Sequence, residues 1–363
     1  MSVDVLPAPV VRQTGDRSSR ARLVIGLLGV CFVFSILLSL ATGPTGVGLG
    51  DLLAWITGRA ETMALQDRVI LESVRIPRTL LGLLAGAGLA VSGAMMQGLF
   101  RNPLADPGIV GVTSGAALAA VIAIVLGGSV LSPVAALLGP WFLPLFAFVG
   151  GLINTLLLYA IATEKGETST TMLVLAGIAI GALTGAATGL LVFWADDRAL
   201  RDITFWSLGS LGGATYAKIL SVLPFIAVVL ALVPFLARGL DALILGDAAA
   251  FHMGVPVQRL KRIAILAVAA ACGATVAAVG SIGFVGIVVP HLLRLVMGPS
   301  HRYLLPGSAL GGAALLVAAD SVARTIVSPA ELPIGIVTAL IGTPVFLFLL
   351  LGRGSGLNFR SLS

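Results

Sequence analysis

The stretch RIAILAVAAACGATVAAVGSIGFVGIVVPHLLRLVM, residues 262–297, runs for 36 residues that are almost all apolar or small. A bilayer core of about 30 Å is crossed by about 20 apolar residues in an α-helix, so this stretch is too long for one crossing. Gly280-Ser281-Ile282-Gly283 offers a glycine-bounded break near its middle. The stretch therefore predicts two membrane spans, 262–280 and 283–297.

The composition of the whole chain agrees with a membrane location. Of its 363 residues, 58% are hydrophobic and 10% are charged, whereas soluble domains average about 25% charged residues. Twenty-two basic and 16 acidic residues cannot cover the surface of a soluble protein of this length. We expect one polytopic membrane domain, residues 23–351, between a polar tail at 1–22 and a second tail at 352–363.

Eight further apolar segments are long enough to cross a membrane. With the two above, the predicted spans are 23–41, 79–99, 108–127, 141–162, 171–194, 216–237, 262–280, 283–297, 306–325 and 333–351. The first is too long for the core of a signal peptide and has no A-x-A-like site after it, so an uncleaved span is expected. The fold class predicted is an all-α membrane protein with ten transmembrane helices.

The distribution of charge supports ten spans with both termini in the cytoplasm. On that topology 14 of the 22 basic residues face the cytoplasm, as the positive-inside rule requires. Merging 262–297 into one span would place Arg302, Arg353 and Arg360 outside. The same topology places Arg75 and Arg78 of the tetrapeptide R-I-P-R at the outer face, where they either snorkel to water or bind a partner.

Several kinds of chemistry are not indicated by the sequence. There is no G-x-x-x-x-G-K-[ST] motif, so any ATP hydrolysis belongs to another subunit and the chain is not expected to be an enzyme. Cys31 and Cys272 lie in apolar runs and are expected to be packing residues. Asp196-Asp197-Arg198 is expected in a solvated loop rather than in an Mg²⁺ site of a membrane prenyltransferase. The basic residues form no stripe typical of nucleic-acid binding.

Ionisable residues inside the predicted spans are few. His291 is a candidate metal or haem ligand, but a structural hydrogen bond near the cytoplasmic end is favoured. Asp320 is expected near the outer end of its span, close to water. An ion-coupled secondary transporter is the alternative from another class, and the shortage of acidic residues in the spans argues against it.

Small residues mark helix faces that can pack closely in a membrane. Gly177, Gly181, Gly185 and Gly189 form a four-residue ladder, and the pairs Gly82/Gly86 and Gly307/Gly311 have the same spacing. The motif G-A-x-x-A-x-x-G occurs at 86–93 and at 273–280, each followed ten residues later by proline. This echo agrees with two five-helix halves of opposite orientation, an architecture found in transporters.

The longest cytoplasmic loop, residues 238–261, is amphipathic and is interrupted by Gly246 and Gly254. We expect two short helices here. They either lie on the membrane surface or dock into a groove on a cytoplasmic motor.

Four stretches resemble one known family over about residues 70–351. They are RIPRTLL from 75, SGAMMQGLFRNPLADPG at 92–108, GFVGIVVPHLLR at 283–294 and AELPIGIVTALIGTPVF at 330–346. Together they resemble the permease subunits of type II ABC importers for iron chelates, haem and vitamin B12. The resemblance implies a homodimer in the bacterial inner membrane, two cytoplasmic ATPase subunits, a periplasmic binding protein and surrounding lipid.

The resemblance also assigns roles to residues. It implies that Arg75, Arg78 and Arg324 meet glutamates of the binding protein. It implies that the coupling helices contact the ATPase through Asp241, Leu245, Gly246, Asp247, Phe251, Met253, Gly254 and Val255. Asn102, Leu104 and Thr170 match the cytoplasmic gate. No metal site and no permanently bound cofactor are expected, because ATP acts through the partner.

The expected cargo is an iron chelate. RNPLADPG followed by SGAAL is most similar to the haem-importing branch, with ferric siderophore and cobalamin as alternatives. Alternating access is the implied mechanism, in which nucleotide binding shifts the populations of the two gate states.

Overall fold

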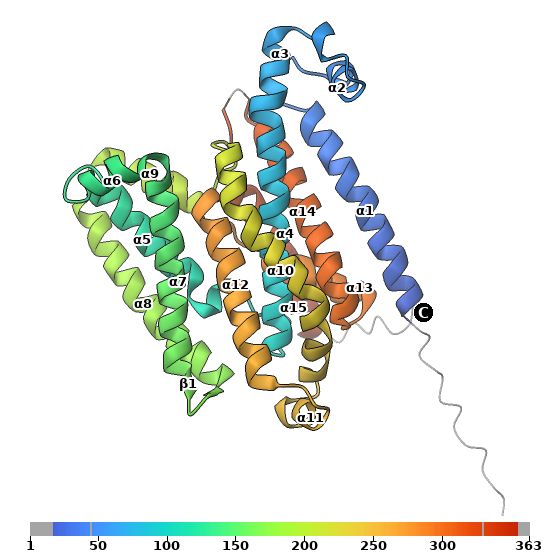
Figure 1. Ribbon diagram of the computed structural model, residues 1–363, viewed down its shortest axis with the longest axis vertical. Helices are drawn as coiled ribbons and strands as arrows, with labels where there is room; N and C mark the ends of the chain where they lie inside the picture. The colour runs from blue at the N-terminus through green and yellow to red at the C-terminus, as the bar shows by residue number, and fades with distance from the viewer. Residues whose placement is uncertain (1–16, 44–45, 329, 355–363) are drawn as a thin grey trace, which may run out of the picture.

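The computed structural model describes residues 17–43, 46–328 and 330–354, and nearly all of them are helical (Figure 1). One hairpin interrupts the helices in this part of the chain. It pairs β1 (Thr163–Glu164) with β2 (Glu167–Thr168), so that Thr163 lies opposite Thr168 and Glu164 opposite Glu167. The prediction of an all-α membrane protein is confirmed.

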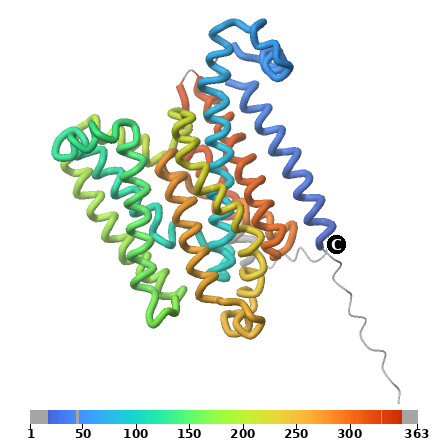
Figure 2. Tube along the Cα trace, in the orientation of Figure 1, coloured from blue at the N-terminus to red at the C-terminus, as the bar shows by residue number. Residues whose placement is uncertain are grey.

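Within the described residues, ten long helices lie side by side (Figures 1 and 2). They are α1 (Ser18–Ala41), α4 (Ile76–Leu99), α5 (Val112–Leu126), α7 (Phe142–Ala162), α8 (Thr170–Trp194), α10 (Tyr216–Leu243), α12 (Val257–Val279), α13 (Val285–Met297), α14 (His301–Thr325) and α15 (Ile334–Gly354). Seven belong to segments long and apolar enough to cross a membrane, and α5, α13 and α15 are shorter apolar helices. Each overlaps one predicted span, which confirms the prediction of ten.

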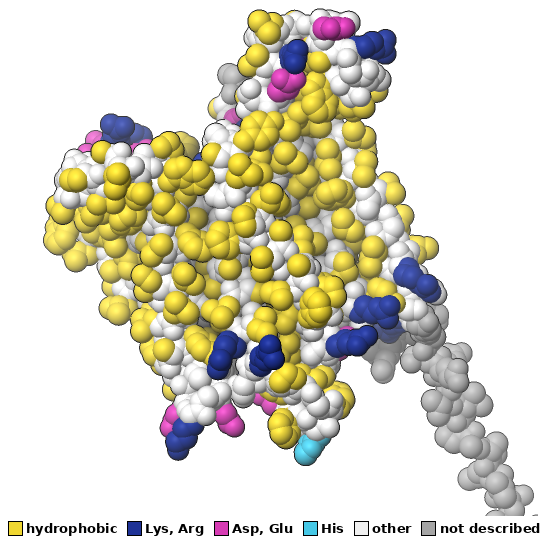
Figure 3. Space-filling view, viewed as in Figure 1, with side chains coloured by type: hydrophobic (Ala, Val, Ile, Leu, Met, Phe, Trp, Pro, Cys, Tyr) yellow, Lys and Arg dark blue, Asp and Glu magenta, His cyan; other side chains and the backbone are white. Residues whose placement is uncertain are grey.

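Shorter elements gather at the two ends of the bundle (Figure 1). One end, called the α2 end below, carries α2 (Leu49–Ile56), η1 (Ala60–Thr62), α3 (Leu65–Ile70), α6 (Ser132–Leu138), η4 (Gly139–Trp141) and α9 (Asp197–Leu208). The other end, called the α11 end, carries α11 (Asp247–His252) and the hairpin, and η3 (Pro107–Val110) follows the turn that leaves α4. Between the two ends hydrophobic side chains cover the surface, while charged side chains gather at the ends (Figure 3). This belt is the surface that a bilayer core accepts.

The apolar stretch 262–297 is broken where the sequence predicts. Helix α12 ends at Val279 and α13 begins at Val285. Gly280 adopts φ +77°, and a Cβ there would collide with the carbonyl oxygen of Trp206 in α9. Glycine is required because only its backbone takes this conformation and this close approach without strain.

Two glycines of α4 allow close backbone contact with other helices. A Cβ on Gly86 would collide with the backbone of Gly312 in α14, and a Cβ on Gly93 would collide with the backbone of Gly286 in α13. At the other predicted pair, a Cβ on Gly307 would lie 2.7 Å from Cε of Met297. The predicted tight packing is therefore present at the pairs on α4 and α14.

The glycine ladder of α8 is different, because its last three members pack against nothing within the described part of the chain. A Cβ built on Gly181, Gly185 or Gly189 meets no atom within 4 Å, whereas one on Gly177 would lie 2.6 Å from the carbonyl oxygen of Ile109. These three residues therefore make no close helix contact within the described part of the chain, and their tight packing stays a prediction. Helix α8 lies at one side of the bundle, so its ladder faces outward (Figure 1).

The loop expected at 238–261 is shorter than predicted and holds one helix instead of two. Helix α10 continues through Leu243, and α12 already starts at Val257. Charged residues such as Arg238 and Asp241 end an apolar span but do not end a helix, because arginine has a high helix propensity and aspartate costs a helix only about 0.7 kcal/mol. Only the six residues of α11 remain as a separate helix between Gly246 and Gly254.

Candidate functional site

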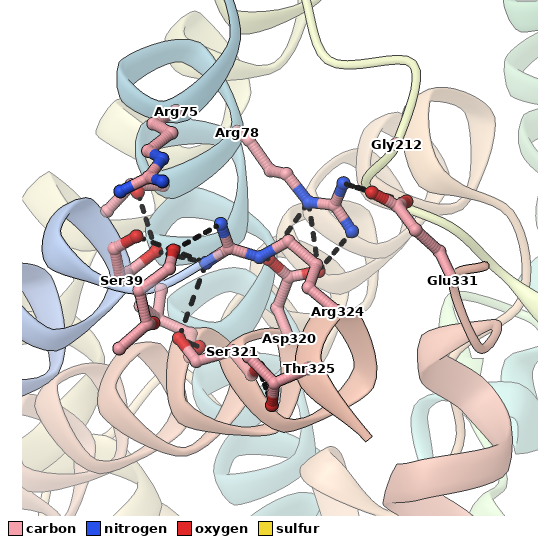
Figure 4. Close-up of polar contacts among 12 residues, drawn as sticks. Ser39, Arg75, Arg78, Gly212, Asp320, Ser321, Arg324, Thr325 and Glu331 are labelled. Carbon is pink, nitrogen blue, oxygen red and sulfur yellow. Dashed lines mark hydrogen bonds and ion pairs between the residues drawn. The ribbon is translucent and has the colours of Figure 1, made fainter. Parts of the chain in front are cut away.

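Three arginines meet near the α2 end of the bundle (Figure 4). Arg75 ends a π-helical turn, η2 (Leu71–Arg75), that joins α3 to α4, and Arg78 lies one turn further along α4. Pro77 follows the π-helical turn directly and has no N–H to donate to it, and the hydroxyl of Tyr216 donates to the carbonyl oxygen of Glu72 in that turn at 2.9 Å. Arg324 comes from the last turn of α14. The π-helical turn and the proline determine the positions from which the side chains of Arg75 and Arg78 project.

Arg78 binds two carboxylates. Its Nε lies 2.9 Å from Oδ2 of Asp320 and its Nη2 lies 2.9 Å from Oδ1, so the guanidinium and the carboxylate form a bidentate pair. Its Nη1 donates to both oxygens of Glu331 at 2.8 Å. This fork-on-carboxylate geometry is the strongest that an arginine can form in a protein. It ties α4 to α14 and to the segment that precedes α15.

Arg324 and Arg75 fasten the end of α1 to the same cluster. Arg324 Nε lies 3.1 Å from Oδ2 of Asp320, and its Nη2 donates to the hydroxyl of Ser39 at 3.0 Å. Arg75 Nη1 donates to the carbonyl oxygens of Leu40 at 2.6 Å and Val47 at 3.0 Å. Carbonyl groups at the end of a helix have no partner inside that helix, so these arginines satisfy them.

The burial of the cluster corrects two expectations. The side chains of Arg78 and Arg324 are 5% and 4% exposed and Arg75 is 2% exposed, so none of the three snorkels to water in the single chain. Asp320 is 2% exposed and is not near water. The physical reason is that acidic partners far along the chain neutralise Arg78 and Arg324, whereas Arg75 donates to backbone carbonyl oxygens.

The α11 end presents large apolar side chains at its surface. Leu245 is 68% exposed, Phe251 70% and Met253 54%. All three belong to α11 or its flanks, and Gly246 at φ +102° and Gly254 at φ +82° turn the chain on either side. Val255 is half-buried. An apolar patch beside a charged rim is typical of a protein contact.

The two aspartates of the predicted coupling set face inward from this patch. Asp241 accepts from the backbone N–H of His301 at 2.7 Å and lies 2.7 Å from Nδ1 of the same residue. Asp247 lies 2.6 Å from the Nζ of Lys261. Each aspartate connects the α11 region to the beginning of another helix, α14 or α12.

The predicted gate residues lie in two turns at the α11 end. Asn102 Oδ1 accepts from the N–H of Leu104 at 3.0 Å and closes the turn that follows α4. Thr170 begins α8 and lines a polar cavity of about 690 Å³ together with Asp247 and Lys261. Arg101 Nη2, next to Asn102, lies 4.0 Å from Oδ1 of Asp247. Through Asp247 the structure brings both turns near α11.

Two buried groups support the turn after α4. His291 is 3% exposed, and its Nδ1 lies 3.3 Å from the carbonyl oxygen of Pro103. The structural hydrogen bond favoured for His291 is therefore present. Burial raises the pKa of the Asp106 carboxyl, although the Gly108 N–H donates to it at 2.7 Å and opposes that shift.

Three residues of these sites could not be identified from the sequence. Glu331 lies inside the AELP motif but was given no role, Ser39 lies in an apolar span, and Lys261 was assigned to a loop. The only available signal for Lys261 was a cation at the edge of an apolar run. Its partners, Thr168 and Asp247, are 93 and 14 residues away in the chain.

Ten spanning helices, a charged cluster near one end and an apolar helix exposed at the other define the membrane-spanning part of a transport protein. Comparison with known proteins agrees, because a model of the FecCD transport family matches residues 31–352. The chain belongs to the FecCD transport family. This agrees with the resemblance that its four sequence motifs indicated.

Individual relatives extend over most of the chain. It is 44% identical to the hemin transport system permease protein HmuU of Yersinia pestis, over 90% of this chain and 95% of that protein. It is 46% identical to the cobalamin import system permease protein BtuC of Halobacterium salinarum, over 79% of this chain and 74% of that protein. A solved structure described as a metal-chelate type ABC transporter in an inward-facing conformation matches with a TM-score of 0.78 and 32% identity, over 92% of this chain and 99% of that one. The chain is therefore an ABC importer permease.

Proposed function

We propose that this permease moves haem from a periplasmic binding protein across the bacterial inner membrane, driven by two ATPase subunits. The observation that carries the proposal is the match to HmuU over 90% of this chain. Because the sequence contains no P-loop motif, we propose that a partner subunit hydrolyses the ATP. The α11 end then faces the cytoplasm, the α2 end faces the periplasm, and both termini are cytoplasmic.

The ATPase contact is proposed at α11 and its flanks. Leu245, Phe251 and Met253 form an exposed apolar surface at the end that carries most of the positive charge. Apolar and aromatic anchors surrounded by polar residues are the usual source of binding energy at protein interfaces. Movement of the ATPase subunits would reach the permease through this helix.

A second copy of the chain is proposed to cover α8. The outward-facing ladder of Gly181, Gly185 and Gly189 allows a helix to approach closely. A homodimer would enclose the transport pathway between the copies.

Replacing Gly181 and Gly185 together by leucine is expected to convert dimers to monomers without unfolding the chain. The leucines fit into open space within one chain but hold the two copies apart. Mass photometry in nanodiscs measures the result, and Gly128→Leu, also in open space but in the turn after α5, is the matched control. Dimers that survive both leucines would contradict this interface.

Docking of the binding protein to Arg75, Arg78 and Arg324 remains a proposal, and the burial of the cluster changes how it would work. The side chain of Glu331 is 40% exposed while Arg78 behind it is 5% exposed. A glutamate of the binding protein would therefore have to displace Glu331 from Arg78 to pair with it. Exchange of one carboxylate for another keeps the guanidinium paired, so it avoids the cost of an unpaired buried charge.

Cobalamin is the second candidate cargo, because the 46% identity to a cobalamin permease is as high as that to the haem permease. The test is competition in proteoliposomes that contain the whole complex with its own binding protein. We expect that excess cobalamin leaves the uptake of hemin unchanged. Uptake of cobalamin in preference to hemin would overturn the cargo assignment and leave the permease class intact.

A further inference from the structure

Lys261 joins two separate elements of the α11 end. It lies in the second turn of α12, and its side chain is 5% exposed. Its Nζ lies 2.6 Å from Oδ2 of Asp247, the first residue of α11, and 3.1 Å from the carbonyl oxygen of Thr168 at the end of β2. The Lys261 ammonium group thus connects α11, the proposed contact for the ATPase, to the loop that precedes α8.

A second contact fixes the same loop to α12. Gln258, one turn before Lys261, accepts from the N–H of Thr168 through its Oε1 at 2.9 Å. Both backbone polar groups of Thr168 are therefore bound by one face of α12. Ser169 follows and caps α8 by accepting from the N–H of Met172 at 3.3 Å. Any displacement of Thr168 accordingly moves the first turn of α8, where the predicted gate residue Thr170 lies.

The two cations at Asp247 differ in strength. Arg101 approaches Asp247 at 4.0 Å with a side chain that is 47% exposed, and such exposed pairs contribute about 0.2–1 kcal/mol. Lys261 is enclosed, so breaking its pair would leave a buried ammonium group without its counter-charge, which is strongly unfavourable. When α11 moves, the contact with Arg101 can open, whereas the contact with Lys261 is retained.

We infer that Lys261 is a positioning residue that transmits movement of α11 to the loop between α7 and α8, and so links the proposed ATPase contact to the cytoplasmic gate. This inference rests on the proposed function. Asp247 moves with α11, Lys261 moves with Asp247, and Thr168, which is bound to Lys261, moves the first turn of α8. Arg101 makes the corresponding but weaker link to the turn that contains Asn102 and Leu104.

The test uses the full complex of permease, ATPase and binding protein in proteoliposomes, with ATP hydrolysis and hemin uptake measured in parallel. Lys261→Met is expected to keep ATP hydrolysis near the wild-type rate while uptake per ATP falls about tenfold, within the usual range of coupling between sites. Lys261→Arg keeps the cation and is expected to restore most of the uptake. Arg259→Met is the matched control, because Arg259 is an exposed cation on the same turn of α12.

Asp247→Asn tests the same link from its other side, and because the asparagine amide oxygen can still accept a hydrogen bond from the Lys261 ammonium group this variant is expected to fold. If the pair acts as a unit, the double variant with Lys261→Met is no worse than the single ones. Unchanged uptake per ATP in Lys261→Met would overturn the inference. Equal losses of ATPase binding and of uptake would also overturn it, because they would show that Lys261 only shapes the docking site.

Hydrogen exchange separates this inference from the proposed function. ATPase binding is expected to protect the amides of 163–170 as well as 247–252 in wild type and Lys261→Arg, but only 247–252 in Lys261→Met. A wild-type complex that binds the ATPase but shows no ATP-driven uptake would contradict the proposed function, and the exchange pattern would still decide the role of Lys261. Protection of 163–170 in Lys261→Met equal to wild type would refute the link.

Discussion

Replacing Asp320 by asparagine is expected to lower the free energy of unfolding by about 3 kcal/mol, the usual cost of removing one partner from a buried ion pair. Asp320 binds Arg78 through a bidentate contact and Arg324 at 3.1 Å, and all three side chains are at most 5% exposed. Asparagine keeps the shape but removes the charge that both guanidinium groups share. Thermal unfolding of the detergent-solubilised protein measures the change.

Asp202→Asn is the matched control for this prediction. Asp202 lies on the exposed surface of α9 at the same end of the molecule, where surface charges contribute little to stability. The control is expected to unfold at the wild-type temperature. If Asp320→Asn also unfolds at that temperature, the cluster does not hold the ends of α1, α4 and α14 together.

Replacing Phe251 by alanine is expected to weaken binding of the ATPase subunit about 30-fold, which corresponds to about 2 kcal/mol for an aromatic anchor at an interface. Phe251 is 70% exposed in the single chain, so its removal costs the fold little and any loss reflects the partner. A fluorescence titration of the ATPase against the permease in nanodiscs gives the affinity.

Phe205→Ala provides the comparison, because Phe205 is 62% exposed but lies in α9, at the α2 end of the molecule. It is expected to bind the ATPase as wild type does. If Phe251→Ala binds the ATPase with unchanged affinity, the ATPase contact does not lie at α11.

The number and approximate place of the helices could be predicted from the sequence, because a bilayer demands about 20 apolar residues for each crossing. The break at Gly280 is the clearest case, since the stretch around it is too long for one helix and contains the residues that end helices. The ends of helices were less predictable. Helix α10 continues to Leu243 past Arg238 and Asp241, because the edge of the membrane does not end a helix.

The charged sites were predictable only in part. The motif that contains Arg75 and Arg78 marked the right region, but the burial of Arg78 depends on Asp320, which is 242 residues further along the chain. Likewise the link from Lys261 to Thr168 joins the start of α12 to a hairpin that no residue pattern indicates. Such contacts come from the packing of helices, and the sequence of one element does not contain them. The glycine ladder of α8 was visible, but whether it faces its own chain or a partner was not.

The most direct test of the account is to reconstitute the permease in liposomes alone and with its ATPase and binding protein, and to measure hemin accumulation with and without ATP. The account predicts accumulation only when the permease, ATPase, binding protein and ATP are all present, with no effect of collapsing the proton or sodium gradient. Accumulation by the permease alone, or uptake that stops when an ion gradient is collapsed while ATP remains, would contradict it.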